Sequence, residues 1–548
     1  MNPSFIYNIF VFVLHINEIF IIYINFFSYV YITWYKNYNN MLIETQYLTN
    51  TKKLVCSYVD KSGDIKMKYY DWDNPMKYIT CEDSDPLKHP TFKSWDGKSV
   101  KQVQVERPDR YAIYEYLDAL PEEEREELFE FNLPKIYFID IETEIVDGFP
   151  EAADIKDADG NVTKEGASTQ VLSISIVYDD KIILLGLKDM PQDMQDRIRD
   201  NTNKYFKKFG SDYKFKYVKY DDEFDMLYAF FHKMIPKMPI LTGWNFLKYD
   251  WLYLVNRSRK ISKWMNGKEY KIDPAVSSPL KRMNKIWNTE FEVPAHRMIF
   301  DYMQLYEICD TSIKVKESSS LDFVSQKLVG VDKIKYTGSL QKLYEDDFET
   351  FMYYNAVDSV LVQKIHEARN YISIVYAISS LSKIRIVDVV SQMNNALASL
   401  AITEGVLRNR FREQDNIVLF KDEKGDGDST IAGGWVKDPV VGMNRWVVTY
   451  DFASLYPTTM LQFFIAPETF IGIQNPHRKT HCDNGREIDY DKHVLCVNGV
   501  VFEKRLSPTL KMIEDVYKDR KINKKIMMQK KEELKVVMDR IKQLESEL

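Results

Sequence analysis

The sequence predicts a protein of several domains that combines α/β and α+β architecture. At roughly 150 residues per domain, its 548 residues correspond to about three or four domains. Hydrophobic residues make up 45% of the chain and charged residues 28%, a composition that is typical of globular domains and excludes wholesale disorder. Strand-like and helix-like runs alternate between residues 135 and 370, which predicts an α/β domain over that range.

The charge balance and the cysteines exclude two classes of protein. The net charge of −7 comes from 74 basic and 81 acidic residues and excludes a polybasic, histone-like protein. Nucleic-acid binding stays open, because a groove needs only a local basic patch. The cysteines are too few and too scattered for a disulfide scaffold, which favours a reducing cytoplasm. They are Cys56, Cys81, Cys309, Cys482 and Cys496.

Residues 1–40 differ from the rest of the chain. The run from Ile19 to Trp34 is almost wholly apolar, but it is shorter than the roughly 20 residues of a spanning helix. A signal peptide fits poorly, because the segment has neither a basic start nor a small-residue cleavage site. Two interpretations remain, a membrane anchor or translated non-coding sequence upstream of a true start at Met41. We expect the second, and therefore no membrane anchoring.

From Met41 the elements can be placed in order. An N-terminal domain (41–134) mixes short strand-like runs with the acidic helix PEEEREELFEF, and we expect 371–422 to pack on it. The α/β domain (135–370) opens with the strand KIYFIDIET, and VLSISIVYDDKIILLGL predicts two strands joined by Asp179 and Asp180. A β-hairpin is expected at 281–301. Helical patterns recur at 222–235, 250–257, 320–328 and 348–368.

Four carboxylates in this domain lie where different elements could bring them together. In the strand FIDIE, Asp140 and Glu142 are two residues apart, so both point to one face. Asp250 begins a helix directly after ILTGWN. Asp358 lies on a helix with Tyr354 one turn before it on the same face. Neighbouring carboxylates repel each other unless a cation lies between them, so the set favours a metal site.

The chemistry that suits such a set is two-metal hydrolysis of a phosphodiester. One hard divalent ion activates water and the other stabilises the leaving oxygen, and both prefer oxygen ligands. We therefore predict Mg²⁺ or Mn²⁺, two ions per active site, with the Tyr354 hydroxyl orienting the attacking water.

These motifs also carry a family resemblance. The order D-I-E, then G-W-N followed by an aspartate, then Y-x-x-x-D resembles the three exonuclease motifs of proofreading family B DNA polymerases. The resemblance implies an RNase H-like 3′→5′ exonuclease domain in which the four acids are metal ligands. The tyrosine in the last motif, where other members have histidine, is typical of the tyrosine subtype.

A second motif extends the resemblance to the polymerase site. The segment DFASLYP follows the predicted strand WVVTYDF (446–452) and resembles polymerase motif A. A carboxylate at a strand end would present Asp451 to both catalytic metals of a partial palm (423–506). The turn's backbone amides could bind a triphosphate, and the tyrosine ring would lie under the sugar. The nucleotide-binding residues implied are Phe452, Ser454, Leu455 and Tyr456.

Flanking segments look like those of T-even phage replicative polymerases. They include GFPE, ILTGWN, SLDF, KYTG, AGGWVKDP and APET, and the resemblance covers residues 41–548. In that group, the segment corresponding to Gly433 and Gly434 lies between the two active sites and contacts the template. The implied partners are primer–template DNA, single-stranded DNA and dNTPs.

The chain from Pro508 onward predicts one long charged helix. Such a charge run is usually a solvated face, and we keep that interpretation for residues 529–548. Arg520 and Lys524 are four residues apart on one face. For these two, the resemblance implies contact with the incoming triphosphate, on the first helix of the fingers (507–548).

The resemblance covers only part of the polymerase machinery. Family members continue with a second fingers helix, a Y-G-D-T-D-S hairpin that supplies the other catalytic aspartate, and a thumb, and these 548 residues hold no such motif. One carboxylate cannot hold two metals, so we expect synthesis only with a C-terminal partner chain carrying the missing palm, fingers and thumb. A sliding clamp would bind through that part. A truncated gene would look identical. A phage-encoded chain of this kind is expected in the host cytoplasm.

Two other functions stay open at this point. One is a stand-alone 3′→5′ exonuclease derived from a polymerase, and intact DFASLYP argues against the decay this requires. The other is a non-catalytic, nucleic-acid-binding or membrane-tethered fragment, which the intact catalytic positions oppose.

Two further patterns are expected to carry no metal. KDADGNVTKE resembles a calcium loop, but Gly160 precedes Asn161 where the pattern needs the reverse order, so a plain turn is predicted. A group of histidines and cysteines near the C-terminal end matches no standard zinc spacing. It comprises His477, His481, Cys482, His493 and Cys496.

Overall fold

The computed structural model contains two compact units. The described residues of 41–73 and 108–398 form the first unit, and those of 74–107 and 399–548 form the second. The structure describes residues 41–48, 50–60, 63–71, 76–80, 92–94, 99–104, 121, 133–146, 148–286, 289–310, 317–382, 386–393, 417–418, 438, 441–443, 445–446, 448, 450, 452, 454–466 and 469–547. The apolar run of residues 19–34 and most of the predicted acidic helix lie outside these ranges.

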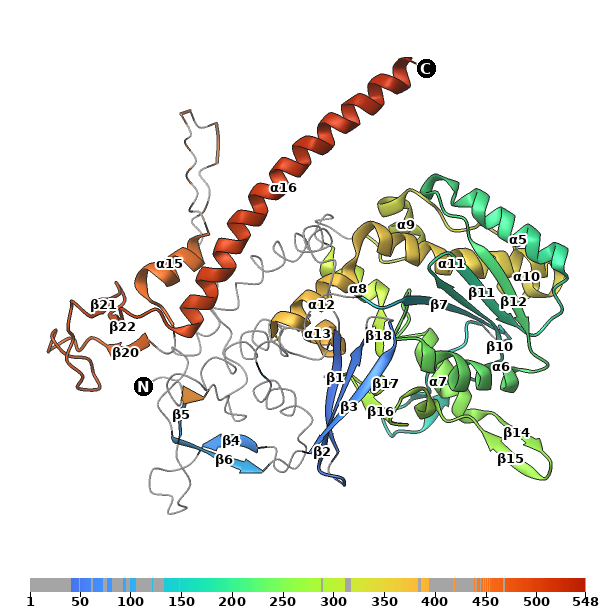
Figure 1. Ribbon diagram of the computed structural model, residues 1–548, viewed down its shortest axis with the longest axis horizontal. Coiled ribbons are helices and arrows are strands. Elements are labelled where there is room, and N and C mark those ends of the chain that lie inside the picture. The colour runs from blue at the N-terminus through green and yellow to red at the C-terminus, as the bar shows by residue number, and fades with distance from the viewer. Residues whose placement is uncertain are drawn as a thin grey trace. The chain divides into compact units, whose positions relative to one another are not determined.

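A sheet of six described strands forms the centre of the first unit (Figure 1). Its order is β12-β11-β10-β7-β13-β18, in which β10 runs antiparallel to β11 and β7 and the other neighbours are parallel. The predicted strand at 135–143 and the two strands joined by Asp179 and Asp180 are confirmed. The strands are β7 (Ile136–Thr143), β10 (Val171–Tyr178), β11 (Lys181–Gly186), β12 (Lys214–Lys219), β13 (Ile240–Gly243) and β18 (Met298–Asp301).

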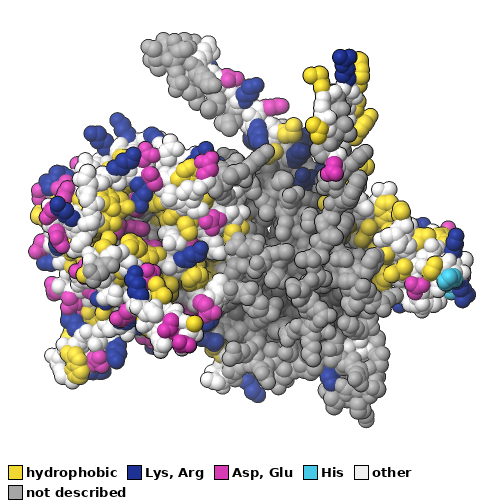
Figure 2. All heavy atoms as spheres, turned by 180° about the vertical axis from the view of Figure 1, so that it is seen from behind, with side chains coloured by type: hydrophobic (Ala, Val, Ile, Leu, Met, Phe, Trp, Pro, Cys, Tyr) yellow, Lys and Arg dark blue, Asp and Glu magenta, His cyan; other side chains and the backbone are white. Residues whose placement is uncertain are grey.

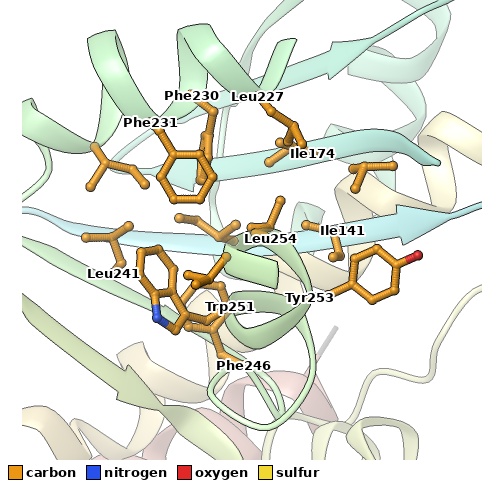
Figure 3. Close-up of a cluster of buried hydrophobic side chains, with 14 of the residues drawn as sticks. Ile141, Ile174, Leu227, Phe230, Phe231, Leu241, Phe246, Trp251, Tyr253 and Leu254 are labelled. Atoms are coloured by element: carbon orange, nitrogen blue, oxygen red, sulfur yellow. The ribbon is translucent and has the colours of Figure 1, made fainter. Parts of the chain in front are cut away.

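One face of this sheet is covered by a hydrophobic core. Side chains alternate along β7, so Ile139 and Ile141 point into this core together with Ile174 of β10. Figure 3 shows Ile141 and Ile174 facing apolar side chains from the helices on this side. Those helices are α6 (Glu223–Ala229), its continuation η3 (Phe230–Met234) and α7 (Asp250–Lys260).

The opposite face of the sheet packs against the helix α11 (Phe348–Arg369). The Asp347 carboxylate caps its first turn by accepting from the Thr350 N–H, and Asn370 in the left-handed conformation ends it. Phe138 of β7 packs on His366 of this helix. The alternate residues of β7, Asp140 and Glu142, therefore lie on the α11 side.

The remaining helices of the first unit follow the predicted pattern closely. The predicted helices at 250–257, 320–328 and 348–368 are confirmed, and 222–235 divides into α6 and short irregular turns. The helices α12 and α13 belong to this unit and pack on α8 and β18. The helices are α5 (Gln192–Tyr205), α8 (Tyr302–Cys309), α9 (Leu321–Val329), α10 (Leu340–Asp346), α12 (Tyr371–Ser382) and α13 (Ile386–Met393), with short turns η2 (Lys207–Phe209), η4 (Ile235–Lys237) and η5 (Pro274–Ser277).

Small antiparallel sheets complete the first unit. The buried Glu44 carboxylate of β1 accepts from the Asn284 side chain and the His296 N–H, which ties the three-stranded sheet β1-β2-β3 to the base of the predicted hairpin at 281–301. The strands are β1 (Met41–Leu48), β2 (Lys53–Val59), β3 (Ile65–Asp71), β8 (Ile155–Lys156), β9 (Val162–Lys164), β14 (Ser262–Met265), β15 (Lys268–Lys271), β16 (Met283–Lys285) and β17 (Glu292–Pro294).

The second unit holds two sheets and two helices in its described residues. The strand β19 pairs in parallel with β5, which joins residues 417–418 to residues 93–94. Its elements are β4 (Met76–Thr80), β5 (Phe92–Ser94), β6 (Ser99–Gln104), β19 (Ile417–Val418), α15 (Leu455–Phe463), β20 (Phe470–Ile473), β21 (His493–Leu495), β22 (Val500–Glu503) and α16 (Pro508–Glu547).

Two predictions for the second unit have different outcomes. The long helix expected from Pro508 is confirmed as α16. The strand expected at 446–452 is not formed in its described residues, which are exposed and lie outside any strand. A strand needs a paired neighbour to satisfy its backbone groups, and no described strand pairs with this segment. No helix among the described residues is long and apolar enough to cross a membrane.

Candidate active site

The acids predicted from the first unit come from three elements around the central sheet. Asp140 and Glu142 lie on β7, Asp250 begins α7, and Asp358 lies in the middle of α11. One ligand oxygen from each of Asp140, Glu142 and Asp358 lies within 4.8 Å of the others. Asp250 lies beside this group, where its Oδ1 accepts from the Ile141 N–H at 3.0 Å.

Close packing of two strands brings Asp250 to β7. At Gly243, the last residue of β13, an added Cβ would lie 2.2 Å from the Ile139 carbonyl oxygen of β7. Only glycine allows this approach, because any other residue would push the strands apart. Gly243 in ILTGWN therefore lets β13 lie close to β7. The loop that follows β13 leads to Asp250, which is thereby brought near the acids of β7.

The electrostatics of the group are unfavourable without a cation. Burial raises the pKa of Asp140 to about 7, and the charge of Asp358 adds to this shift. Burial, followed by the charges of Asp140 and Asp358, raises the pKa of Glu142 well above its ordinary value. The pKa of Asp250 is also raised, first by burial and then by Asp140. The site thus concentrates negative charge where few solvent dipoles can offset it.

Lys333 supplies a positive charge in contact with Asp358, and sequence reasoning missed it. Its Nζ lies 2.6 Å from Asp358 Oδ2, and the Lys333 N–H donates to Asp322 Oδ1 at 2.7 Å, which anchors the loop after α9. The charge of Asp358 raises the pKa of Lys333 against the effect of burial. The segment KIKYTG lies between two helices, and nothing in its spacing connects this lysine to an acid 25 positions later.

Tyr354 lies where the helix periodicity predicts, one turn before Asp358. Its hydrogen bond to Asp358 opposes the rise in that carboxyl's pKa. The Lys333 ammonium lies 5.0 Å from the centroid of the Tyr354 ring, and Tyr336 packs edge-on against the ring at 5.2 Å. The hydroxyl is therefore held beside the carboxylates by contacts on several sides.

The donor set fits hard divalent cations. All the converging groups are carboxylates, the ligands that Mg²⁺ and Mn²⁺ prefer. The buried Asp358 Oδ1 has no hydrogen-bond partner among the described residues, which is costly for a charged oxygen unless a ligand satisfies it. Asp140, Glu142 and Asp358 are the residues that would hold such an ion, with Asp250 beside them.

A stability measurement can test this charge arrangement. The Asp140 carboxyl ionises near pH 3.8 in the unfolded chain but near 7 in the folded one. Between these pH values the folded state binds more protons than the unfolded chain, so the free energy of unfolding falls as pH rises. It stops falling above pH 7, where the carboxyl is ionised in both states. We expect Asp140→Asn to stabilise the metal-free protein by about 1–2 kcal/mol at pH 8 and hardly at all at pH 4. Urea unfolding at both pH values measures this, and equal shifts would contradict it.

The residues predicted for a polymerase site fall in the sequence range of the second unit, and the structure describes only some of them. Arg520 on α16 donates to the Ser454 hydroxyl at 2.7 Å, which brings the charged helix against the start of α15. Phe452 and Leu455 are exposed, Tyr456 is partly buried, and Lys524 is exposed. Ser454 is in the left-handed conformation with φ of 53°. Asp451, Gly433 and Gly434 lie outside the described residues.

The two patterns expected to carry no metal have ordinary local structures. The Asp157 carboxylate accepts from the Asp159 and Asn161 N–H groups, which closes the predicted turn. In the histidine and cysteine group, His493 Nδ1 accepts from the Asp489 N–H. Among the described residues, the acid group at Asp140 is the cluster of potential ligands that converges closely enough for a metal.

Models of a known protein family match segments of both units. The family model for the exonuclease domain of DNA polymerase family B matches residues 114–329, and the model for DNA polymerase family B matches residues 396–545. The chain belongs to DNA polymerase family B. Three of the acids lie inside the exonuclease match, whereas Lys333 and Asp358 lie beyond it and reach the site through the fold.

Individual relatives agree with the family assignment. The DNA-directed DNA polymerase of Escherichia phage RB69 is 25% identical over 342 residues, 61% of this chain and 35% of that protein. That of Enterobacteria phage T4 is 26% identical over 315 residues, 57% and 34% of the two chains. The DNA polymerase catalytic subunit of human herpesvirus 7 is 25% identical over 282 residues, 48% and 26%. The match therefore spans about a third of the length of these phage relatives.

Proposed function

We propose that this chain carries the 3′→5′ proofreading exonuclease of a replicative family B DNA polymerase, with Asp140, Glu142, Asp250 and Asp358 as ligands for two divalent ions. The convergence of Asp140, Glu142 and Asp358 carries the proposal, and the exonuclease family model, which matches residues 114–329 and so includes the first two, supports it. The mixed sheet with its single antiparallel β10 between β11 and β7 supports the predicted RNase H-like assignment.

The chain's own residues prepare the site for hydrolysis. Bound divalent ions would supply an activated water and stabilise the leaving oxygen. Tyr354 is placed to hold that water, because its hydroxyl lies beside Asp358. Lys333 would turn from Asp358 toward the scissile phosphate, where its charge opposes the negative charge that develops in the transition state.

An exposed phenylalanine, packed on a partly buried tyrosine beside the acids, favours single-stranded DNA as substrate. The Phe149 side chain is 60% exposed, and its ring centroid lies 4.9 Å from that of Tyr249. The Tyr249 hydroxyl contacts the Thr143 hydroxyl at 3.3 Å, next to Glu142. Unpaired bases stack on such rings, whereas paired bases are already stacked. On the face shown in Figure 2, positive and negative side chains are interspersed over the first unit.

The polarity and the metal requirement can be tested together. With Mg²⁺ and a 5′-labelled single strand, we expect a ladder that shortens one nucleotide at a time from the 3′ end. A fully paired duplex should be digested more slowly, and a chelator should stop digestion until Mg²⁺ or Mn²⁺ is restored. Release of the 5′ label as a mononucleotide, or digestion that a chelator leaves unchanged, would contradict the proposal.

We further propose that the second unit is part of a polymerase site for dNTPs and primer–template DNA. The hydrogen bond between Arg520 and Ser454 supports this, because it brings a triphosphate-binding candidate to the motif A turn. The 548 residues offer one motif A carboxylate and no second one of the D-T-D type. Synthesis would therefore depend on palm, fingers and thumb residues beyond these 548, supplied by a C-terminal partner chain or by a continuation of the same polypeptide, and a sliding clamp would bind through that part.

A further inference from the structure

A buried polar pair lies directly behind Asp140. The Asn355 side chain on α11 donates through Nδ2 to Asp140 Oδ2 at 2.8 Å. The Ser173 hydroxyl on β10 donates to Asn355 Oδ1 at 3.1 Å. Both Asn355 and Ser173 are fully buried. The hydrogen bonds thus run from the sheet to the helix and back to the acid.

The carboxylate and the serine together satisfy the amide. Because the ionised Asp140 carboxylate only accepts, the NH₂ group of Asn355 faces it, and the Ser173 hydroxyl donates to the amide oxygen that remains. Ser173 lies opposite Glu142 in the β10–β7 ladder, so the strand pairing that places the acids also places the serine. An amide in the middle of a buried helix face is costly unless its groups are satisfied, and here Ser173 and Asp140 satisfy the amide of Asn355.

The group that donates to Asp140 is an uncharged amide, whereas the group that contacts Asp358 is the charged ammonium of Lys333. An ammonium competes with a metal ion for a carboxylate, whereas an amide fixes the plane of the carboxylate and leaves its charge for the ion. We propose that Asn355, oriented by Ser173, is a positioning residue that holds Asp140 ready for divalent-metal binding. This inference rests on the proposed exonuclease function and concerns residues that the family motifs did not bring into the prediction.

The chain offers matched controls on both elements. Gln363 lies eight positions after Asn355 on α11, about 12 Å along the helix, and is also buried and fully hydrogen-bonded, to the Tyr213 hydroxyl at 2.6 Å and the Asp179 carbonyl at 2.8 Å. Ser175 is fully buried on β10, opposite Asp140, and its hydroxyl has no hydrogen-bond partner among the described residues. Asn355→Leu and Gln363→Leu form one pair, and Ser173→Ala and Ser175→Ala form the other.

The test measures Mn²⁺ binding to the 548-residue protein without DNA, from the electron paramagnetic resonance signal of free Mn²⁺, alongside the unfolding temperature. We expect Asn355→Leu to weaken Mn²⁺ binding by about 10-fold or more, the usual effect of losing a partner that orients a metal ligand. Ser173→Ala should weaken it several-fold. Gln363→Leu and Ser175→Ala should bind Mn²⁺ as the unmodified protein does, although Gln363→Leu loses thermal stability.

Several outcomes separate this inference from the proposed function. If the unmodified protein neither binds Mn²⁺ nor digests single-stranded DNA, the proposed function fails. If it does both and Asn355→Leu binds Mn²⁺ equally well, only the positioning role is overturned. Equal weakening by Ser173→Ala and Ser175→Ala would also overturn it, because the effect would then belong to β10 in general. Should Asn355→Leu fail to fold, the two serine variants decide the question.

Discussion

Replacing Asp140 and Glu142 together by alanine should lower the rate of single-strand digestion by several orders of magnitude. These residues supply two of the three carboxylates that converge within 4.8 Å, and the remaining acids cannot hold two ions in position. The rate at saturating Mg²⁺ and at saturating Mn²⁺ should fall alike, because the ligands themselves are missing. A quench time course on a 5′-labelled oligonucleotide measures both rates.

The fold provides the control for this loss. Burial raises the pKa of all three carboxyls, and the charge of Asp358 adds to the rise at Asp140 and Glu142. Removing two of these charges should leave the unfolding temperature of the metal-free protein unchanged or higher. Tyr354→Phe should be milder, about 10- to 100-fold, since it removes a water-orienting hydroxyl and no ligand. Undiminished digestion by the folded double variant would show that Asp140 and Glu142 do not form the exonuclease site.

The sequence predicted which acids share a face because that depends on local periodicity. Asp140 and Glu142 share a face because a strand alternates, and Tyr354 lies beside Asp358 because a helix repeats every 3.6 residues. The boundaries of α11 were also predictable, since an aspartate cap and a charged, asparagine-ended terminus mark them.

The residues that the sequence did not reveal act across long separations. Lys333 reaches Asp358 from a loop, and Ser173 reaches Asn355 across 182 positions. Serines alternating with isoleucines in VLSISIVY do signal a polar stripe on a buried strand, but only the packing of α11 shows what they contact. The described residues of the strand predicted at 446–452 lie outside any strand, and strand formation depends on a neighbour that a local pattern cannot identify.

DNA synthesis should separate cleanly from exonuclease activity. We expect the 548-residue polypeptide to show no primer extension with dNTPs and Mg²⁺, because motif A supplies Asp451 alone and nucleotidyl transfer by two metals needs a second carboxylate. Adding a polypeptide with the remaining palm, fingers and thumb of the family should restore extension. A gel assay of a labelled primer on a longer template measures this, with the added polypeptide alone as the background.

Reciprocal variants give this prediction its sharpest form. Asp451→Ala should abolish the restored synthesis and leave single-strand digestion intact, whereas the double alanine variant at Asp140 and Glu142 should do the reverse. Asp140 and Glu142 lie in the first compact unit, whereas position 451 falls in the sequence range of the second, so we expect each change to affect its own activity. Robust extension by the isolated 548-residue polypeptide would refute the prediction, since it would require a second metal-binding carboxylate within these residues. Extension that survives Asp451→Ala would show that motif A does not hold the metals.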